Sequence, residues 1–191
     1  MKNLLIFSLI LLLAACQKTQ EQPSAELNDM SIYHLPSHWE TQAGDSIALE
    51  DLRGQVLVTV MIYTSCKVAC PRLVADMKNI EKAIGQKTKT PVKYVLISID
   101  PNTDTPQRLR EFASANQMTG KQWLFLRSSE DNTREFANVL AVKYASISPV
   151  DFSHSNIISV FDKEGVMQHQ MEGLAVNNDE TLKAIRKYAD Q

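Results

Sequence analysis

The sequence of 191 residues lacks concentrated positive charge. Its formal net charge is −2, and it has neither a block of basic residues nor a basic patch interleaved with aromatic residues. Proteins that bind nucleic acid need such charge, so we expect no nucleic acid among the partners. The sequence has no internal repeat, and its apolar run at residues 4–15 is shorter than the ~20 residues that span a bilayer. We therefore expect a globular protein preceded by a short N-terminal leader.

Cysteine is scarce, since the sequence has only Cys16, Cys66 and Cys70. Cys16 follows a basic start, an apolar run and two small residues, which is the pattern of a signal peptide. Residues 13–16, Leu-Ala-Ala-Cys, also resemble a bacterial lipobox, and by that resemblance Cys16 is the acylated first residue of the mature protein. An ordinary secretory peptide with an incidental Cys16 is the alternative. In both cases the protein is exported to a compartment that permits disulfides.

Composition divides the chain into three parts. Residues 1–15 form the predicted signal peptide, and residues 16–29 form a polar, lipidated tether that stays outside the core. Residues 30–191 are long enough for one domain with a full core and too short for two.

Apolar patterning predicts an α/β fold. Residues 56–63 are continuously apolar and rich in β-branched side chains, as in a strand buried on both faces. Apolar residues then recur at helical spacing up to Ile84, and Gly85 is the expected C-terminal cap. Further strands are expected at residues 92–99, 122–126, 156–161 and 166–171, and further helices at 106–117, 132–144 and from 178 or 179 onward.

The order of these elements matches a thioredoxin-like fold, with a central mixed sheet flanked by helices and an inserted helix–strand segment. Residues 30–52 predict an N-terminal hairpin that turns at Gly44 and Asp45. Thr105 is expected to cap the helix that begins at Pro106. Residues 146–154, which contain Pro149, predict a loop.

Cys66 and Cys70 lie between the central strand and its helix. A helix N-terminus favours thiolate over thiol, and a helix that begins near Cys66 would place both side chains on one face, roughly 6 Å apart. That separation permits a disulfide, and it also permits two thiolates to bind one soft metal ion. Two buried core cysteines without a function are the remaining alternative.

His154 is the best candidate for a third metal ligand, because it stands just before a strand at an edge where strand ends converge. A structural histidine bonded to loop backbone is the alternative. Two thiolates and an imidazole favour copper or zinc. Three ligands leave one coordination position of the metal open, which suits a protein that transfers its metal to a partner.

Three sequence blocks resemble the Sco/SenC family, the copper chaperones of cytochrome c oxidase assembly. Residues 64–71, Thr-Ser-Cys-Lys-Val-Ala-Cys-Pro, resemble that family's TxCxxxCP motif. The second block is Asp100-Pro101 followed by residues 104–106, Asp-Thr-Pro, and the third is residues 151–155 with the later residues 161–165. The blocks stand in the family's order and cover nearly the whole mature domain.

This resemblance implies a thioredoxin-like domain anchored to a membrane on its extracytoplasmic, periplasmic side. It implies a copper ion held by Cys66, Cys70 and His154, and a partner that is the copper-bearing subunit of cytochrome c oxidase. Because copper binds only the reduced thiols, we also expect a thiol reductant protein as a partner.

Three features depart from the family pattern. Many relatives have proline after the first motif cysteine, where this chain has Lys67, and the anchor here resembles a lipid instead of a transmembrane helix. The histidine block is also a looser match than the cysteine block.

An enzyme is the alternative function. A thiol–disulfide oxidoreductase would use Cys66 as nucleophile and Cys70 as resolving thiol, with a disulfide between them. Redox enzymes of this fold usually carry C-x-x-C, and no proline stands immediately before Asn156, where thioredoxin-type reductases place one. His154 is needed for copper and not for dithiol exchange. We therefore favour a metallochaperone without turnover.

Overall fold

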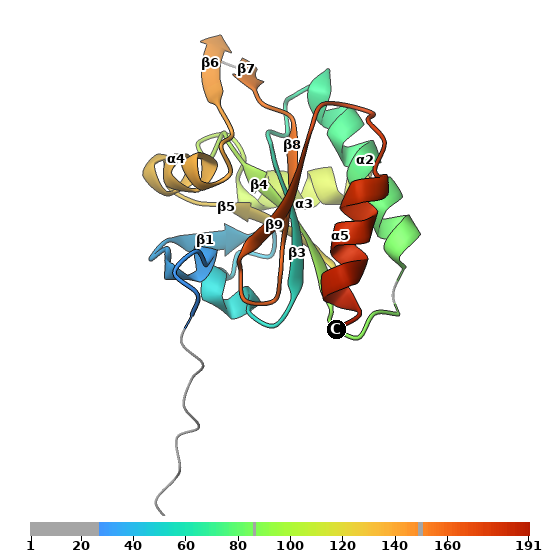
Figure 1. Cartoon of the computed structure of the whole chain (residues 1–191). Helices are drawn as coiled ribbons and strands as arrows, with labels where there is room; N and C mark the ends of the chain where they lie inside the picture. The colour runs from blue at the N-terminus through green and yellow to red at the C-terminus, as the bar shows by residue number, and fades with distance from the viewer. Residues whose placement is uncertain (1–26, 86, 149–150) are drawn as a thin grey trace, which may run out of the picture.

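The computed structural model describes residues 27–85, 87–148 and 151–191 (Figure 1). The predicted signal peptide, most of the predicted tether and Cys16 lie outside these residues. A seven-stranded sheet forms the centre of the described domain, in the order β2-β1-β5-β4-β3-β8-β9. Its strands are β1 His38–Thr41, β2 Ser46–Ala48, β3 Val56–Ile62, β4 Val92–Ser98, β5 Trp123–Arg127, β8 Ile157–Phe161 and β9 Met167–Glu172.

Strand β3 occupies the interior of this sheet, and every one of its residues is buried. It pairs in parallel with β4 and antiparallel with β8, so both of its edges are hydrogen-bonded. A run of β-branched and apolar residues suits this position because both faces are covered by other elements. The mixed sheet confirms the predicted α/β, thioredoxin-like fold.

Helices flank the sheet. They are α2 Ala69–Ile84, α3 Pro106–Ala115, α4 Glu130–Val139 and α5 Asp179–Ala189, with the short 3-10 helices η1 Ile32–His34 and η2 Leu49–Leu52. Helices α2 and α5 lie side by side, with α5 also in contact with β3, β8 and β9 (Figure 1). Among the described residues, no helix is both long and apolar enough to cross a membrane.

Two helix boundaries follow the predicted capping chemistry. Thr105 caps α3, since its side-chain oxygen accepts a hydrogen bond from the Arg108 N–H at 3.3 Å. Gly85 ends α2 with a φ of 74°, a left-handed conformation that glycine adopts without a steric penalty.

Other boundaries differ from the prediction. Helix α4 ends at Val139 and not at residue 144, because Ala141 takes a φ of 52° and directs the chain out of the helix. Helix α2 begins at Ala69, three residues after Cys66. The predicted N-terminal hairpin, by contrast, is confirmed: it consists of β1 and β2, and β1 also joins the main sheet by pairing with β5.

The predicted loop at 146–154 is wrong for the described residues. Strands β6 Tyr144–Ser148 and β7 Asp151–His154 pair antiparallel and form a second, two-stranded sheet. This hairpin projects from the upper end of the molecule in Figure 1, away from the main sheet. The sequence gives little sign of it because its side chains are largely exposed or half-buried, so no continuous apolar face marks the strands.

Candidate metal centre

Cys66 and Cys70 meet at the junction of β3 and α2. Cys66 lies in the turn before the helix, and Cys70 is the second residue of α2. Both are buried and both are free thiols. The Cys70 N–H donates a hydrogen bond to the Cys66 sulfur at 3.3 Å. The turn thus brings Cys66 over the start of the helix, where unpaired amide donors favour a negative sulfur.

His154, the last residue of β7, completes the cluster. Its Nδ1 lies 3.0 Å from the Ser155 carbonyl oxygen, and because a carbonyl can only accept, Nδ1 carries the proton. The unprotonated Nε2 lies 4.0 Å from the Cys70 sulfur. His154 therefore does bond to backbone, but through the nitrogen that leaves Nε2 available as a ligand atom.

Local hydrogen bonding makes the two thiols unequal. Burial would raise the pKa of Cys66, but hydrogen bonds from the Cys70 and Val68 amides and from the side chains of Cys70 and Tyr63 outweigh it and lower the pKa. Burial raises the pKa of the Cys70 thiol, and the negative charges of Cys66 and Asp104 add to this effect. Cys66 is therefore the more acidic thiol of the pair.

Burial also lowers the pKa of His154, while its hydrogen bond to the Ser155 carbonyl opposes this. The neutral imidazole is therefore favoured, which is the form that binds metal ions. The cluster combines one readily ionised sulfur, one buried sulfur and one neutral ring nitrogen.

The three donor atoms fit a single soft metal ion. The two sulfurs and the imidazole nitrogen all lie within 4.8 Å of one another. Donors that each sit about 2.0–2.3 Å from a shared ion, at trigonal angles, are about 4 Å apart. Small shifts would thus bring the three atoms to bonding distance, and two sulfurs with one nitrogen are a donor set that selects copper or zinc.

A buried carboxylate supports the turn that leads into Cys66. Asp104 is fully buried and accepts hydrogen bonds from the Thr64 N–H at 3.1 Å, from the Thr64 hydroxyl and from the Ser98 hydroxyl at 2.6 Å. Asp104 belongs to the second family-like block of the sequence, and the turn that it stabilises is the one before Cys66. Tyr63 contacts both halves of the cluster, and no sequence pattern assigned it a role; its position directly before the cysteine block was the available signal.

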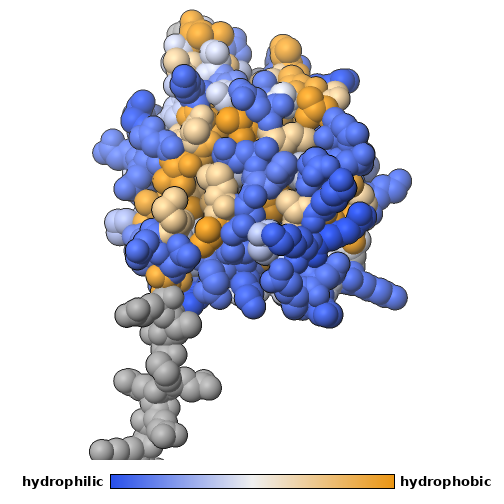
Figure 2. Space-filling model, in the orientation of Figure 1, coloured by the Kyte–Doolittle hydropathy of each residue, from blue (hydrophilic) through white to orange (hydrophobic). Residues whose placement is uncertain are grey.

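Exposed apolar side chains flank the opening above the cluster. Val68, on the helix side, is 83% exposed, and Ile147, in the hairpin, is 69% exposed. Figure 2 shows hydrophobic side chains gathered at this upper end of the molecule, over the hairpin and the start of α2. A cavity of about 390 Å³ lies between these two walls and is lined by Cys66, Val68, Ile147 and His154 among others.

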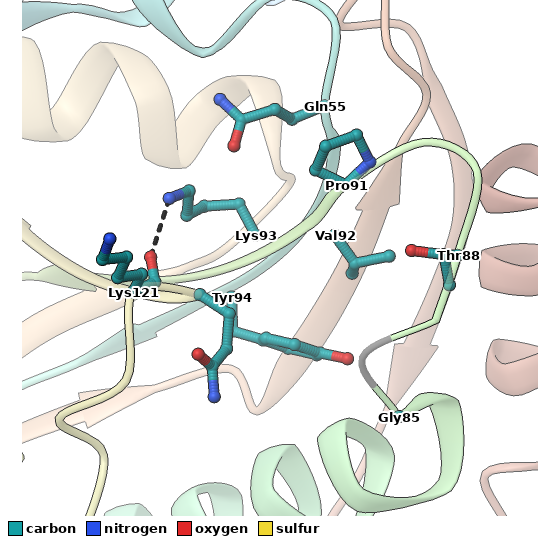
Figure 3. A pocket seen from close by; sticks show the side chains of 9 residues that line it. Gln55, Gly85, Thr88, Pro91, Val92, Lys93, Tyr94 and Lys121 are labelled. Carbon is teal, nitrogen blue, oxygen red and sulfur yellow. Dashed lines mark hydrogen bonds between the residues drawn. The ribbon is translucent and has the colours of Figure 1, made fainter.

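A second cavity, at the opposite end of the sheet, has different chemistry. It has a volume of about 260 Å³ and lies where β4 begins, whereas Cys66 follows the end of β3. Figure 3 shows Lys93 and Lys121 among its lining side chains, with the Lys93 ammonium bonded to the Lys121 carbonyl at 2.8 Å. Its described lining residues include no cysteine, histidine or carboxylate, so it offers no comparable ligand set for a soft metal.

Comparisons with known proteins agree with the sequence resemblance. Residues 33–190 match the family model described as SCO1/SenC. The SCO1 protein homolog of Bacillus subtilis is 30% identical over 138 residues, which cover 71% of this chain and 68% of that protein. A SCO2-like protein of Rickettsia typhi is 25% identical over 130 residues, 65% of this chain and 62% of that protein.

Solved structures share the fold. A SCO1/SenC family lipoprotein from Bacillus anthracis superposes with a TM-score of 0.73 at 21% identity, covering 86% of this chain and 99% of that one. Arabidopsis thaliana ScoI with copper bound superposes with a TM-score of 0.70 at 20% identity, covering 80% of this chain and 97% of that one. BsSco superposes with a TM-score of 0.69 at 23% identity, covering 82% of this chain and 94% of that one. It is described as a member of the Sco family of cytochrome c oxidase assembly proteins and as containing a disulfide switch.

Proposed function

Because the chain belongs to the SCO1/SenC family, we propose that it is a copper-binding metallochaperone whose ligands are Cys66, Cys70 and His154. The observation that carries this proposal is the convergence of two sulfurs and an imidazole nitrogen within 4.8 Å. Thiolate ligands select Cu(I), and imidazole suits either copper state. The copper bound to the Arabidopsis family member supports copper over zinc as the cargo.

The proposed recipient is the copper-bearing subunit of cytochrome c oxidase. Family membership supports this, as does the oxidase-assembly role given for BsSco. Three protein donors leave a coordination position open, so a ligand of the recipient can enter before a donor of this chain leaves. The cavity between Val68 and Ile147 provides access to that position.

We further propose that Cys16 is lipidated and that residues 16–29 tether the domain to the membrane on its periplasmic side. The lipoprotein from Bacillus anthracis supports such an anchor. In this oxidising compartment a thiol reductant protein is required, since a Cys66–Cys70 disulfide cannot bind copper.

The unequal acidity of the two thiols favours a second candidate, a thiol–disulfide oxidoreductase. The Cys66 thiolate would attack a partner disulfide, form a mixed disulfide and release one partner thiolate. Cys70, after losing its proton, would attack the Cys66 sulfur and release the second partner thiol. The partner is then reduced, and a Cys66–Cys70 disulfide is formed.

Anaerobic titration of the reduced protein, without residues 1–16, separates the two candidates. If the protein is a copper chaperone, it should bind one equivalent of Cu(I) tightly, and Cys66→Ser should lose this binding. His169→Ala is the control and should retain it, because His169 bonds Thr181 and not the cluster. No tight binding, together with a readily cycled Cys66–Cys70 disulfide, would overturn the chaperone function in favour of the oxidoreductase.

A further inference from the structure

The hydroxyl of Tyr63 joins the central sheet to the strand that carries His154. Tyr63 directly follows β3 and is 4% exposed. Its hydroxyl donates to the Phe152 carbonyl oxygen at 3.3 Å and accepts from the Phe152 N–H, also at 3.3 Å. Phe152 stands two residues before His154 in β7. One side chain thus bonds both backbone groups of a single residue next to the proposed ligand.

This contact matters because no strand pairing joins the β6–β7 hairpin to the main sheet in the part of the chain that the structure describes. An isolated two-stranded hairpin is at best marginally stable in water. At its base the Ser155 N–H donates to the Lys143 carbonyl at 2.8 Å, which closes the hairpin but does not attach it to the sheet. The position of His154 therefore depends on side-chain contacts such as that of Tyr63.

The ring of Tyr63 contacts the same strand. It meets the Phe152 ring edge-to-face with centroids 5.3 Å apart, and the His154 ring with centroids 5.9 Å apart at 82°. Edge-to-face pairs of this kind stabilise the contact beyond the burial of area alone. The hydroxyl is also a hydrogen-bond partner of Cys66. Tyr63 therefore touches Cys66 on one side and the His154 strand on the other.

We propose that Tyr63 is a positioning residue that holds β7, and with it the His154 imidazole, against the cysteine pair. The proposal rests on the proposed function, since it assigns Tyr63 a role in that same metal site. Tyr63 itself is not a ligand. Its phenol carries one proton, which it can donate to either Phe152 or Cys66, while it accepts from the Phe152 N–H in both cases.

Hydrogen exchange in the metal-free, full-length wild-type protein tests the positioning directly. The Phe152 amide is expected to be protected, although it points toward Tyr63 and not toward β6. In Tyr63→Phe, which keeps the ring and removes the hydroxyl, exchange at this amide should be about tenfold faster. An unprotected Phe152 amide in the wild type, or equal exchange in the two proteins, would overturn the proposal.

Copper binding tests whether the effect acts through His154. Tyr63→Phe should weaken Cu(II) binding about tenfold and shift the Cu(II) absorption toward that of His154→Ala. In a His154→Ala background the same substitution should have no further effect, because the ligand that it positions is already gone. An equal loss in both backgrounds would show that Tyr63 does not act through His154.

Tyr33→Phe is the matched control, because Tyr33 is 5% exposed and also donates to a backbone carbonyl, that of Leu52 at 3.2 Å. It should leave copper binding and Phe152 exchange unchanged. If the wild-type protein binds no copper, the proposed function fails, while Phe152 exchange in the metal-free protein still decides whether Tyr63 positions the strand.

Discussion

The Nε2 atom of His154 lies 4.0 Å from the Sγ atom of Cys70, although 84 positions separate the two residues in the chain. The first belongs to a projecting hairpin and the second to the buried start of a helix. The cluster is therefore a product of tertiary structure.

The proposed ligands should differ in their importance. We expect Cys66→Ser or Cys70→Ser to abolish tight copper binding, because a single thiolate and one imidazole remain. His154→Ala should weaken binding by about 10–100-fold, most visibly for Cu(II), for which imidazole is a better ligand. Competition titrations against a chelator of known affinity would measure this. Unchanged affinity in His154→Ala would remove the third ligand from the proposed site.

Alkylation should distinguish the two thiols. The pKa of Cys66 is lowered and that of Cys70 is raised, so Cys66 becomes a thiolate at lower pH. Iodoacetamide should modify Cys66 first in the reduced, metal-free protein. Its rate should rise with pH and level off above the Cys66 pKa, while Cys70 stays largely unmodified. Peptide mass spectrometry over a pH series measures both rates, and preferential labelling of Cys70 would contradict the assignment.

Asp104→Asn should change how stability depends on pH. Burial raises the pKa of the Asp104 carboxyl, with opposing hydrogen bonds from Ser98 and Thr64. The folded state then holds this proton more tightly than the unfolded state. Its contribution is fully present below the ordinary pKa of about 4 and is lost as pH rises through the raised pKa.

The free energy of unfolding of the wild type should therefore fall, relative to that of Asp104→Asn, as pH rises above about 4. The variant should also be less stable overall by about 1–3 kcal/mol, since an acceptor for Thr64 or Ser98 is lost. Urea denaturation at several pH values measures both effects. The exposed Asp45→Asn is the control for removing a charge, and parallel pH curves for wild type and Asp104→Asn would refute the prediction.

Gly165→Ala should destabilise the fold more than Gly44→Ala. Both glycines have left-handed backbones, with φ of 75° and 92°, so each substitution costs about 1–2 kcal/mol in backbone strain. A Cβ at Gly165 would also lie 2.8 Å from the Tyr33 ring and 2.9 Å from the Ser31 hydroxyl, whereas Gly44 faces open space. The overlap adds about 1–3 kcal/mol. Equal losses in thermal or urea unfolding would show that the contact relaxes freely.

The interior of the fold was predictable because its signals are local. Strand β3 is a continuous apolar run, and Leu73, Met77 and Ile80 repeat at helical spacing and are buried as expected. The β6–β7 hairpin was not predicted, since Ser146 and Ser153 alternate with few apolar residues and no local pattern marks a buried face. The contact between Tyr63 and Phe152 joins it to the central sheet over a long separation in the chain, which no local pattern encodes.

The site was predictable in its members and not in its details. The spacing of Cys66 and Cys70 and the family-like block around His154 suggested the three residues that lie together. The sequence could not show that the helix begins at Ala69, between the two cysteines, or that Ser155 determines which imidazole nitrogen is free. Their role as copper ligands stays a prediction until binding is measured.

The separation of the β6–β7 hairpin from the main sheet has a consequence for ligand exchange. In the proposed copper site, the two sulfurs would act as a chelating pair on the buried junction of β3 and α2, and the imidazole would be a tethered third donor whose effective concentration depends on the hairpin. We therefore expect an incoming donor to compete first with the imidazole, whose strand is not paired with the main sheet. Changes in the hairpin should then alter the rate of transfer more than the stability of the fold.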